Sequence, residues 1–269
     1  MNDKIEFGEI EQLEGSYNIN GSEEKMNLRT GDPNRIVMIS DTHGKHAGIP
    51  RIPDGDILIH AGDFTMTGGK SEVMDFSEFL ASLPHRLKIV IAGNHDVTFD
   101  EDYYESKGRN RFHRWRDHMN PAQVRSILID APGVIYLEDS GYFDEQSGLS
   151  FWGSPWSPEF CDWAFNVKCG EDCAAKWAMI PEWTDVLITH GPPYGFLDQV
   201  NPNQKNVGCR ELAQEVQGRI KPRVHIFGHV HESYGCITDS NITYVNASTC
   251  DFFYKPNQPP IVVDLPRTI

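Results

Sequence analysis

The sequence predicts an α/β fold in which two β-sheets pack together with helices outside. Short β-rich apolar runs follow one another in the first third of the chain, with a helical pattern between two of them. The order strand, strand, helix, strand is typical of an α/β layer. In the middle of the chain, closely spaced apolar runs are broken by Asp-Ser-Gly and Gln-Ser-Gly turns, which favours antiparallel strands as well.

The first elements follow residue 34. Residues 36–40, 57–60 and 87–92 are apolar, rich in β-branched side chains and bounded by turn formers, so we predict buried strands. Apolar side chains recur at helical spacing over 73–83, behind Ser71. This spacing predicts an amphipathic helix with Ser71 as its N-cap.

The remaining elements are predicted in the same way. The middle of the chain contains the three runs expected to form antiparallel strands, at 134–138, 141–144 and 149–153. A strand, a helix and a strand then follow at 185–189, 211–220 and 224–227. Three more runs make a β-rich end, at 233–237, 242–245 and 261–264.

The length and the residue pattern of the chain indicate one domain, large enough to be catalytic. The chain has 269 residues, and a single α/β unit often reaches about 200–250. Residues 1–34 contain acidic residues, Asn, Gly and Ser, and their apolar residues follow neither helical nor strand periodicity. We therefore predict a polar N-terminal extension over 1–34, followed by the domain over 35–269.

Charge and composition exclude several classes of function. Lys and Arg number 24 against 39 Asp and Glu, a net charge of −15 that repels a phosphate backbone, so duplex nucleic acid is not an expected partner. No run approaches the roughly 18 apolar residues of a membrane helix, and the first residues lack the apolar core of a signal peptide. We therefore expect a soluble cytoplasmic protein without a membrane partner, with its 6 cysteines reduced.

Five of the predicted strands end in an Asp, Asn or His beside a glycine. The carboxyl ends of strands are where open α/β sheets build their sites, and glycine allows a sharp turn and close approach of the backbone. The side chains collected at these ends are Asp41, His43, Asp63, Asn94, His190, His229 and His231.

These side chains favour two metal ions over one. They are too many for a single tetrahedral ion, and the set lacks the thiolates of structural zinc sites. A carboxylate such as Asp63 can bridge two divalent ions about 3.5–4 Å apart. Asp41 and His43, at i and i+2 of a pleated strand end, face the same way and can share one ion. His229 and His231 do likewise, unless a bridged pair places them on different ions.

Five motifs in this order resemble those of the calcineurin-like metallophosphoesterases. They are Asp41-x-His43, Gly62-Asp63, Gly93-Asn-His-Asp96, His190-Gly191 and Gly228-His-Val-His231, and the resemblance runs from about Arg35 to the carboxyl end. Further runs resemble the metallophosphoesterase-domain-containing protein family, namely Ile91-Ala-Gly-Asn-His95, Thr189-His-Gly-Pro-Pro193 and Tyr244-Val-Asn-Ala-Ser-Thr249. That family is similar to cyclic-nucleotide-type phosphodiesterases of broad specificity. Some relatives lack the first histidine of the last motif and are weak catalysts, whereas this chain has His229.

The resemblance implies a four-layer α/β/β/α sandwich of two mixed sheets and a role for each motif residue. The first metal would be held by Asp41, His43 and His231, the second by Asn94, His190 and His229, with Asp63 bridging both. His95 would contact the phosphate and support the leaving oxygen, and Asp96 would orient the His95 ring.

The expected activity is phosphodiester hydrolysis by a metal-bound hydroxide, on nucleotide-type or cyclic nucleotide substrates. The nitrogen and oxygen ligands suit exchangeable divalent ions, with Mn²⁺ favoured over Fe, Zn, Co or Mg. A phosphomonoesterase and a non-catalytic, metal-binding interaction protein stay open as alternatives. Protein phosphatases of this superfamily follow the second motif with an arginine, and purple acid phosphatases place a tyrosine ligand three residues after the bridging Asp. Here those positions are Phe64 and Met66.

Three features outside the motifs leave two interpretations each. The basic segment 107–116 is either a solvated face or a rim that attracts anionic substrate. The aromatic segment 152–165 is either core or a stacking wall beside the metals. For the six histidines outside the motifs, surface or hydrogen-bonded core roles are favoured over ligation: His46, His60, His85, His113, His118 and His225.

Overall fold

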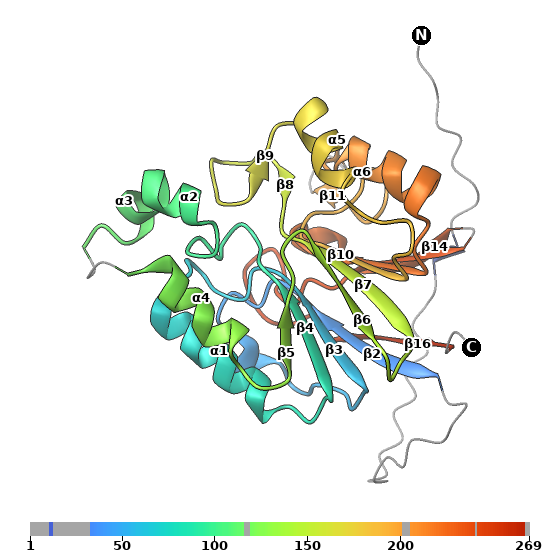
Figure 1. Cartoon of the computed structure of the whole chain (residues 1–269), viewed down its shortest axis with the longest axis horizontal. Helices are drawn as coiled ribbons and strands as arrows, with labels where there is room; N and C mark the ends of the chain where they lie inside the picture. Colours follow the sequence, from blue (N-terminus) through green and yellow to red (C-terminus); the bar gives the residue numbers. More distant parts are fainter. Residues whose placement is uncertain (1–10, 13–32, 116–118, 201–204, 240, 267–269) are drawn as a thin grey trace.

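The computed structural model describes residues 11–12, 33–115, 119–200, 205–239 and 241–266. Its strands form two large sheets (Figure 1). One sheet has the order β16 (Ile261–Leu265), β2 (Asn34–Ile39), β3 (Ile57–Ala61), β4 (Leu87–Ile91) and β5 (Val134–Tyr136). The other has the order β1 (Glu11–Gln12), β14 (Gly235–Asp239), β15 (Ile242–Asn246), β13 (Val224–Phe227), β10 (Val186–Thr189), β7 (Leu149–Ser154) and β6 (Ser140–Asp144).

Helices and short strand pairs complete the described chain. The α-helices are α1 (Lys70–Ser82), α2 (Glu101–Tyr103), α3 (Arg109–Phe112), α4 (Pro121–Ile129), α5 (Glu171–Trp177) and α6 (Arg210–Glu215). Segments of 3-10 and π-helix lie at His46–Gly48, His231–Ser233, Tyr104–Gly108 and Val216–Ile220. The short pairs are β8 (Ser157–Pro158) with β9 (Asn166–Val167), and β11 (Gln199–Val200) with β12 (Lys205–Asn206).

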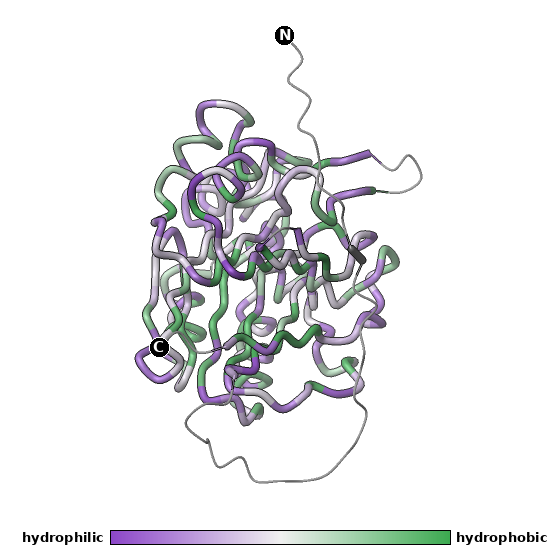
Figure 2. The backbone as a smooth tube through the Cα atoms, turned by 90° about the vertical axis from the view of Figure 1, so that its right-hand side faces the viewer, coloured by the Kyte–Doolittle hydropathy of each residue, from purple (hydrophilic) through white to green (hydrophobic). Residues whose placement is uncertain are grey.

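The alternation of apolar side chains along the central strands makes four layers. In β2, Ile36 and Met38 face the second sheet, whereas Val37 and Ile39 face α1 and α4. In β10, Ile188 joins the core between the sheets. Strands buried on both faces are expected to be apolar throughout, as these are. Figure 1 shows α1 and α4 covering one sheet and α5 and α6 the other, and in Figure 2 the hydrophobic segments gather in the interior. The α/β/β/α sandwich predicted from the sequence is confirmed.

Both sheets are mixed, with parallel strands at the centre. Strands β2 to β5 are parallel and β16 is antiparallel to β2; β7, β10, β13 and β15 are parallel, with β6 and β14 antiparallel at the sides. The carboxyl ends of the parallel strands meet where the two sheets adjoin, linked by a bridge between Ser40 and Ser248. This edge carries the predicted site residues.

The structure corrects several local predictions. Strand β5 pairs in parallel with β4 in the first sheet, so only β6 and β7 of the three middle runs are antiparallel neighbours. Helix α1 begins after Gly69 and not at Ser71, because the Glu72 carboxylate accepts from the Gly69 N–H at 2.8 Å and closes the first turn. The helix at 211–220 changes to π-helix at Val216. The run at 233–237 enters its strand only at Gly235.

The predicted extension 1–34 lies mostly outside the described residues. Within it, Glu11–Gln12 pairs as β1 with β14, and Asn34 opens β2. The division of the chain at residue 34 stays a prediction. Among the described residues, no helix is both long and apolar enough to span a membrane.

Candidate metal centre

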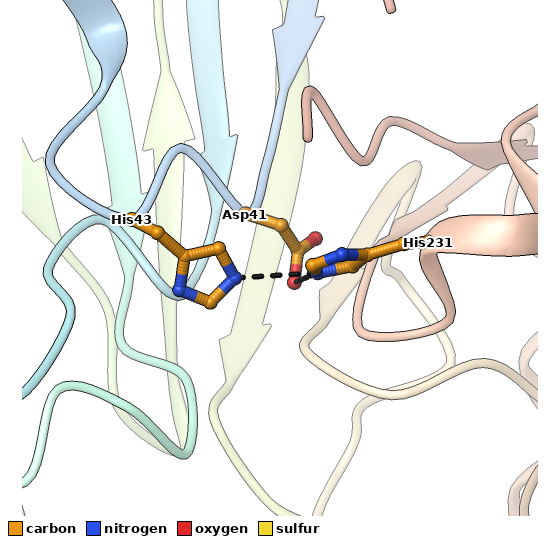
Figure 3. A group of neighbouring side chains, drawn as sticks. All are labelled: Asp41, His43 and His231. Carbon is orange, nitrogen blue, oxygen red and sulfur yellow. Dashed lines mark hydrogen bonds and ion pairs between the residues drawn. The ribbon is translucent and has the colours of Figure 1, made fainter. Parts of the chain in front are cut away.

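The first cluster of predicted ligands contains Asp41, His43 and His231 (Figure 3). Their ligand atoms lie within 4.8 Å of one another. His43 Nε2 is 3.2 Å from His231 Nε2, and His231 Nε2 is 3.4 Å from Asp41 Oδ1. Two strands from different sheets thus bring together the residues that the sequence assigns to the first ion.

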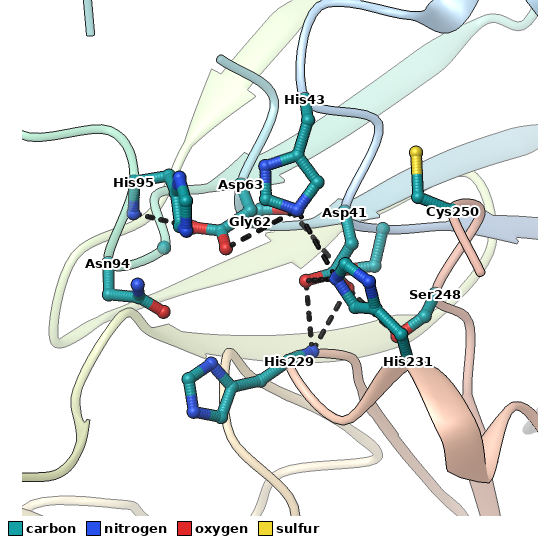
Figure 4. Close-up of polar contacts among 12 residues, drawn as sticks. Asp41, His43, Gly62, Asp63, Asn94, His95, His229, His231, Ser248 and Cys250 are labelled. Carbon is teal, nitrogen blue, oxygen red and sulfur yellow. Dashed lines mark hydrogen bonds and ion pairs between the residues drawn. The ribbon is translucent and has the colours of Figure 1, made fainter. Parts of the chain in front are cut away.

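The second cluster contains Asp63, His190 and His229, again with ligand atoms within 4.8 Å of one another. Asn94 Oδ1 joins it, 2.9 Å from His190 Nε2. The Asp63 carboxylate lies between the clusters, with Oδ2 3.4 Å from His190 Nε2 and 3.8 Å from His43 Nε2. Figure 4 shows His43, Asp63, Asn94 and His229 among the side chains that converge from the ends of both sheets. The arrangement agrees with two ion positions that share Asp63.

The hydrogen bonds behind the ligands fit a cation at the centre. His190 Nδ1 lies 3.0 Å from the Ala61 carbonyl, and His231 Nδ1 lies 3.1 Å from the Asp251 carbonyl. A carbonyl only accepts, so each Nδ1 carries a proton, and Nε2 of each ring is the nitrogen that would bind an ion after losing its own proton. His43 Nε2 and His231 Nε2 face each other at 3.2 Å, next to the Asp41 carboxylate. A divalent ion fits this donor set, because imidazole nitrogen and carboxylate oxygen are among its preferred ligands.

A left-handed backbone conformation sets the direction of several ligand side chains. Asp41, His43, Asp63 and His229 have φ of 49°, 45°, 55° and 68°, in the left-handed region that most residues avoid. The expectation that Asp41 and His43 share a face of a pleated strand is therefore wrong, because β2 has ended at Ile39 and a turn brings them together. His229 and His231 point to different clusters, which is the second of the two arrangements expected from sequence.

Asp41 is held by groups that the motif analysis did not assign. Its carboxylate accepts from the His229 N–H at 3.0 Å and from Ser248 Oγ at 3.0 Å. A Cβ on Gly228 would overlap this carboxylate, so only glycine fits before His229. The signal for Ser248 was present in the sequence, in the run Tyr244-Val-Asn-Ala-Ser-Thr249, but nothing in its spacing pointed to Asp41.

Burial and charge set the protonation of the centre. Burial lowers the pKa of His43 to about 3 and the pKa of His229 to about 4. Burial also opposes charge on His190, but the nearby Asp63 carboxylate raises the pKa of His190 to about 9. Burial likewise opposes ionisation of Asp63, yet the His190 charge holds the pKa of Asp63 well below its usual range. His43 and His229 are therefore neutral near pH 7, as metal ligands must be.

His95 lies beside the ligands, on the wall of the cavity. Its backbone N–H donates to Asp63 Oδ1 at 2.7 Å, and its Nδ1 donates to the Met66 carbonyl at 2.9 Å. The prediction that Asp96 orients the His95 ring is wrong. Asp96 instead accepts from the Thr65 N–H at 2.9 Å and the Gly93 N–H at 2.8 Å, and so joins the two loops that carry Asp63 and Asn94. Burial, with repulsion from Asp63, raises the pKa of Asp96 to about 8.

The aromatic segment 152–165 divides between the two interpretations. Trp152 and Phe165 are buried in the cores, whereas Phe160 and Trp163 line the cavity. Trp163 stacks on His95, with ring centroids 4.0 Å apart and planes at 24°, and on Phe112 at 4.5 Å and 29°. Trp163 therefore supports a predicted catalytic side chain.

The basic segment 107–116 packs partly against the same region. Arg111 lies over the Trp163 ring at 5.1 Å and donates to the Cys161 carbonyl at 3.0 Å. Lys107 pairs with Asp162 at 2.6 Å. Arg116 lies outside the described residues. These contacts place Lys107 and Arg111 against the aromatic segment; contact of the basic segment with substrate stays a prediction.

Histidines predicted to lie outside the site make core hydrogen bonds. His60 Nε2 lies 3.0 Å from Thr42 Oγ1, and His225 Nε2 lies 2.8 Å from Thr189 Oγ1. His85 contacts the Pro53 carbonyl at 3.0 Å, and His46 pairs with Asp75 at 3.1 Å. His113 Nδ1 lies 3.2 Å from Tyr104 OH, and His118 lies outside the described residues.

The clusters open into a cavity of about 890 Å³. Besides His43, Asp63, Asn94, His229 and His231, it is lined by aromatic residues and by two cations: Phe160, Trp163, Tyr194, Phe252, Tyr254, Lys205 and Arg210. This volume suits a small organic phosphate.

The fold and this centre define a metallophosphoesterase, and the comparisons with known proteins agree. The family model of the calcineurin-like phosphoesterases matches residues 34–233. The chain belongs to that family, which catalyses metal-dependent hydrolysis of phosphoric esters.

Two relatives support the same assignment, and a solved structure shares the fold. The chain is 47% identical to metallophosphoesterase domain-containing protein 1 of Homo sapiens over 234 residues, 86% of this chain and 71% of that protein. It is 39% identical to a UPF0046 protein of Caenorhabditis elegans over 236 residues, 86% of this chain and 81% of the relative. The solved structure of TT1561 of Thermus thermophilus shares the fold at 12% identity and a TM-score of 0.53, covering 86% of this chain and 99% of its own.

Proposed function

We propose that the protein is a dinuclear-metal phosphodiesterase acting on nucleotide-type or cyclic nucleotide substrates. The observation that carries this proposal is the pair of ligand clusters sharing Asp63 on the wall of an aromatic-lined cavity. Two ions about 3.5–4 Å apart are suited to in-line displacement at phosphorus, because they stabilise the attacking and leaving oxygens together. We favour Mn²⁺, since each cluster offers nitrogen and oxygen ligands without thiolate.

The residue after Asp63 favours diesters over monoesters. Phe64 is fully buried and stacks on Phe76, with ring centroids 4.6 Å apart, so this position directs no cation toward the metals. The two cations that line the cavity, Lys205 in β12 and Arg210 at the start of α6, belong to other elements than the loop that carries Asp63. A monoester dianion would lack the additional charge that it needs, whereas a diester carries a single negative charge.

The cavity wall also supports a nucleotide-sized substrate. Tyr254 lies within 4.8 Å of His43 and 5.2 Å of His231 between ring centroids, and Tyr194 carries Arg210 over its ring at 3.6 Å. Both of these rings are half-buried, and Arg210 covers one face of Tyr194. Phe160 and Phe252 also line the cavity and are 58% and 62% exposed, and exposed aromatic faces bind bases by stacking. We propose that these two phenylalanines, and not the already stacked Trp163, form the wall for a base.

The side chains divide the chemistry between them. Two bound ions would supply Lewis acidity and lower the pKa of water. Asp41, His43 and His231 would hold one ion, and Asn94, His190 and His229 the other. His95 donates through Nδ1 to Met66, so Nε2 is the atom that would give a proton to the leaving oxygen. Asp96 holds the loops in register and touches no substrate.

Diesters are expected to be cleaved with a higher kcat/KM than matched monoesters. The test is a panel that pairs bis(p-nitrophenyl) phosphate with p-nitrophenyl phosphate, and cyclic AMP with AMP, at one fixed Mn²⁺ concentration. A monoester preference in both pairs would reject the diesterase proposal and favour a phosphatase. Absence of turnover on all four by fully metallated protein would favour the interaction protein.

Trp163→Ala is expected to lower kcat by roughly 3- to 10-fold, because a stacked aromatic pair contributes about 0.5–1.5 kcal/mol. Loss of His95 positioning should slow an alkoxide leaving group more than nitrophenolate, which needs little protonation. Trp163→Phe should restore most of the rate, and Trp115→Ala, at a side chain 88% exposed, serves as the control. An equal loss on both leaving groups, or a further loss in a His95→Ala background, would contradict this role.

We also propose a small phosphodiester or nucleotide as the partner, with no duplex nucleic acid, and a cytoplasmic location. The net charge of −15 would repel a phosphate backbone, which supports the exclusion of duplex nucleic acid as a partner. The six cysteines, all free thiols in the structure, are compatible with a reducing compartment. Co-purification of duplex DNA or RNA at physiological salt would argue against this proposal.

A further inference from the structure

A second group of possible metal ligands lies apart from the dinuclear centre. Cys173, in α5, and Cys209, the N-cap of α6, are both buried, and Glu211 lies in the first turn of α6. The two sulfur atoms and a Glu211 oxygen lie within 4.8 Å of one another. The two cysteines are far apart in the sequence and form no Cys-x-x-Cys pair, so spacing gave no sign of them.

The distances and hydrogen bonds are those of a metal-binding group. Cys209 Sγ lies 3.3 Å from Glu211 Oε2. Zinc–ligand bonds of about 2.3 Å to sulfur and 2.0–2.2 Å to oxygen put two tetrahedral ligands roughly 3.5 Å apart. The other Glu211 oxygen accepts from the Gly170 N–H at 2.8 Å, and Cys209 Sγ accepts from Trp177 Nε1 at 3.1 Å. Such outer hydrogen bonds orient a carboxylate ligand and stabilise a thiolate.

We propose that Cys173, Cys209 and Glu211 form a separate site for one zinc ion or a similar soft divalent cation. Zn²⁺ would displace the thiol protons to solvent, leaving two thiolates and one carboxylate on the ion. Cys169 is an exposed thiol just before α5 that lines the cavity together with Glu211, and it would supply the fourth ligand. Thiolates select zinc, whereas the dinuclear centre offers only nitrogen and oxygen.

The site would stabilise one wall of the substrate cavity. It joins the start of α5 to the start of α6, and the cavity is lined there by Cys169, Gly208, Arg210 and Glu211. The ion would have no free position for substrate once Cys169 binds, which is the pattern of a structural site. Its role is therefore to fix this wall, separately from hydrolysis at the dinuclear centre.

Cobalt spectroscopy on the full chain tests the proposal, because only sulfur ligands give a thiolate-to-cobalt charge-transfer band in the near ultraviolet. Metal-free, reduced protein titrated with Co²⁺ should show this band, and one equivalent of Zn²⁺ should remove it. Cys173→Ser and Cys209→Ser should each lose the band, Cys169→Ser should weaken it, and Glu211→Gln should weaken cobalt binding. Cys161→Ser, at an exposed thiol, should leave it unchanged.

Three results would overturn the site. The first is absence of the band in the wild-type protein, and the second is its persistence in both Cys173→Ser and Cys209→Ser. The third is a Cys173–Cys209 disulfide in peptide mass maps of the protein as purified, which would indicate a redox pair instead. Glu211→Gln removes no thiol from the core, so it tests the site even if a serine variant fails to fold. None of these readouts depends on phosphoester hydrolysis.

Discussion

His95→Ala is expected to lower kcat about 10²–10⁴-fold on a substrate with an alkoxide leaving group while keeping both ions of the proposed dinuclear centre. General acid assistance has this size, equivalent to roughly 3–5 kcal/mol of barrier. The ligand set is complete without this ring, which binds Met66 through Nδ1 and lies on the cavity wall. With nitrophenolate as the leaving group the loss should be much smaller, because that anion needs little protonation.

The measurement compares kcat on both leaving groups with metal content in the same preparations. His229→Ala is the matched variant, because its ring belongs to the cluster with Asp63 and His190, and its loss should lower metal occupancy as well as rate. His95 also lies within ligand distance of His43 and Asp63. Loss of metal from His95→Ala would therefore make His95 a ligand, and wild-type turnover on the alkoxide substrate would remove it from catalysis.

The strands and the membership of the two clusters could be predicted because both follow from local patterns. Apolar runs followed by Gly with Asp, Asn or His mark the ends of β2, β3, β4, β10 and β13, and parallel strands bring such ends to one edge. The ligands therefore come together at this edge, and this does not depend on the detailed conformation of the loops. Motif order supplied the division between clusters, which spacing alone had left open for His229 and His231.

The direction in which each side chain points could not be predicted from these local patterns. Asp41 and His43 have φ of 49° and 45°; Asp and His adopt this conformation more often than most residues but still rarely, so residue type does not predict it at a given position. The groups that fix the rings are backbone carbonyls of Ala61, Met66 and Asp251, which carry no sequence signal. Asp96 was assigned to the wrong partner for the same reason.

The pairing of strand β5 likewise could not be predicted from the local sequence pattern. Its run at 134–136 is followed within a few residues by β6, so short spacing favoured an antiparallel pair. The chain instead crosses from one sheet to the other at Asp139, which has φ of 44° and accepts from Ser154 Oγ at 2.7 Å and Trp156 Nε1 at 2.9 Å. This change of sheet depends on contacts distant in sequence.

Removal of the ions is expected to have the largest effect of all, a fall of phosphoester hydrolysis to background. With no ion present, the centre presents two carboxylates that would repel an anionic substrate, and it holds no Lewis acid to activate water at neutral pH. Chelation should therefore abolish turnover, and Mn²⁺ should restore it. Asp63→Asn should prevent full restoration, because Asp63 lies between both clusters. Asp264→Asn, in an exposed pair with Arg35, is the control.

The most direct test is a Mn²⁺ titration of chelated protein, with bound Mn²⁺ and turnover of a diester measured on the same samples. If Asp63 joins two ions, activity should rise to its maximum only as the second equivalent binds, and Asp63→Asn should stay near background at any occupancy. Full diester turnover in metal-free protein, or a maximum at a single equivalent with Asp63→Asn as active as Asp264→Asn, would contradict the two-metal centre.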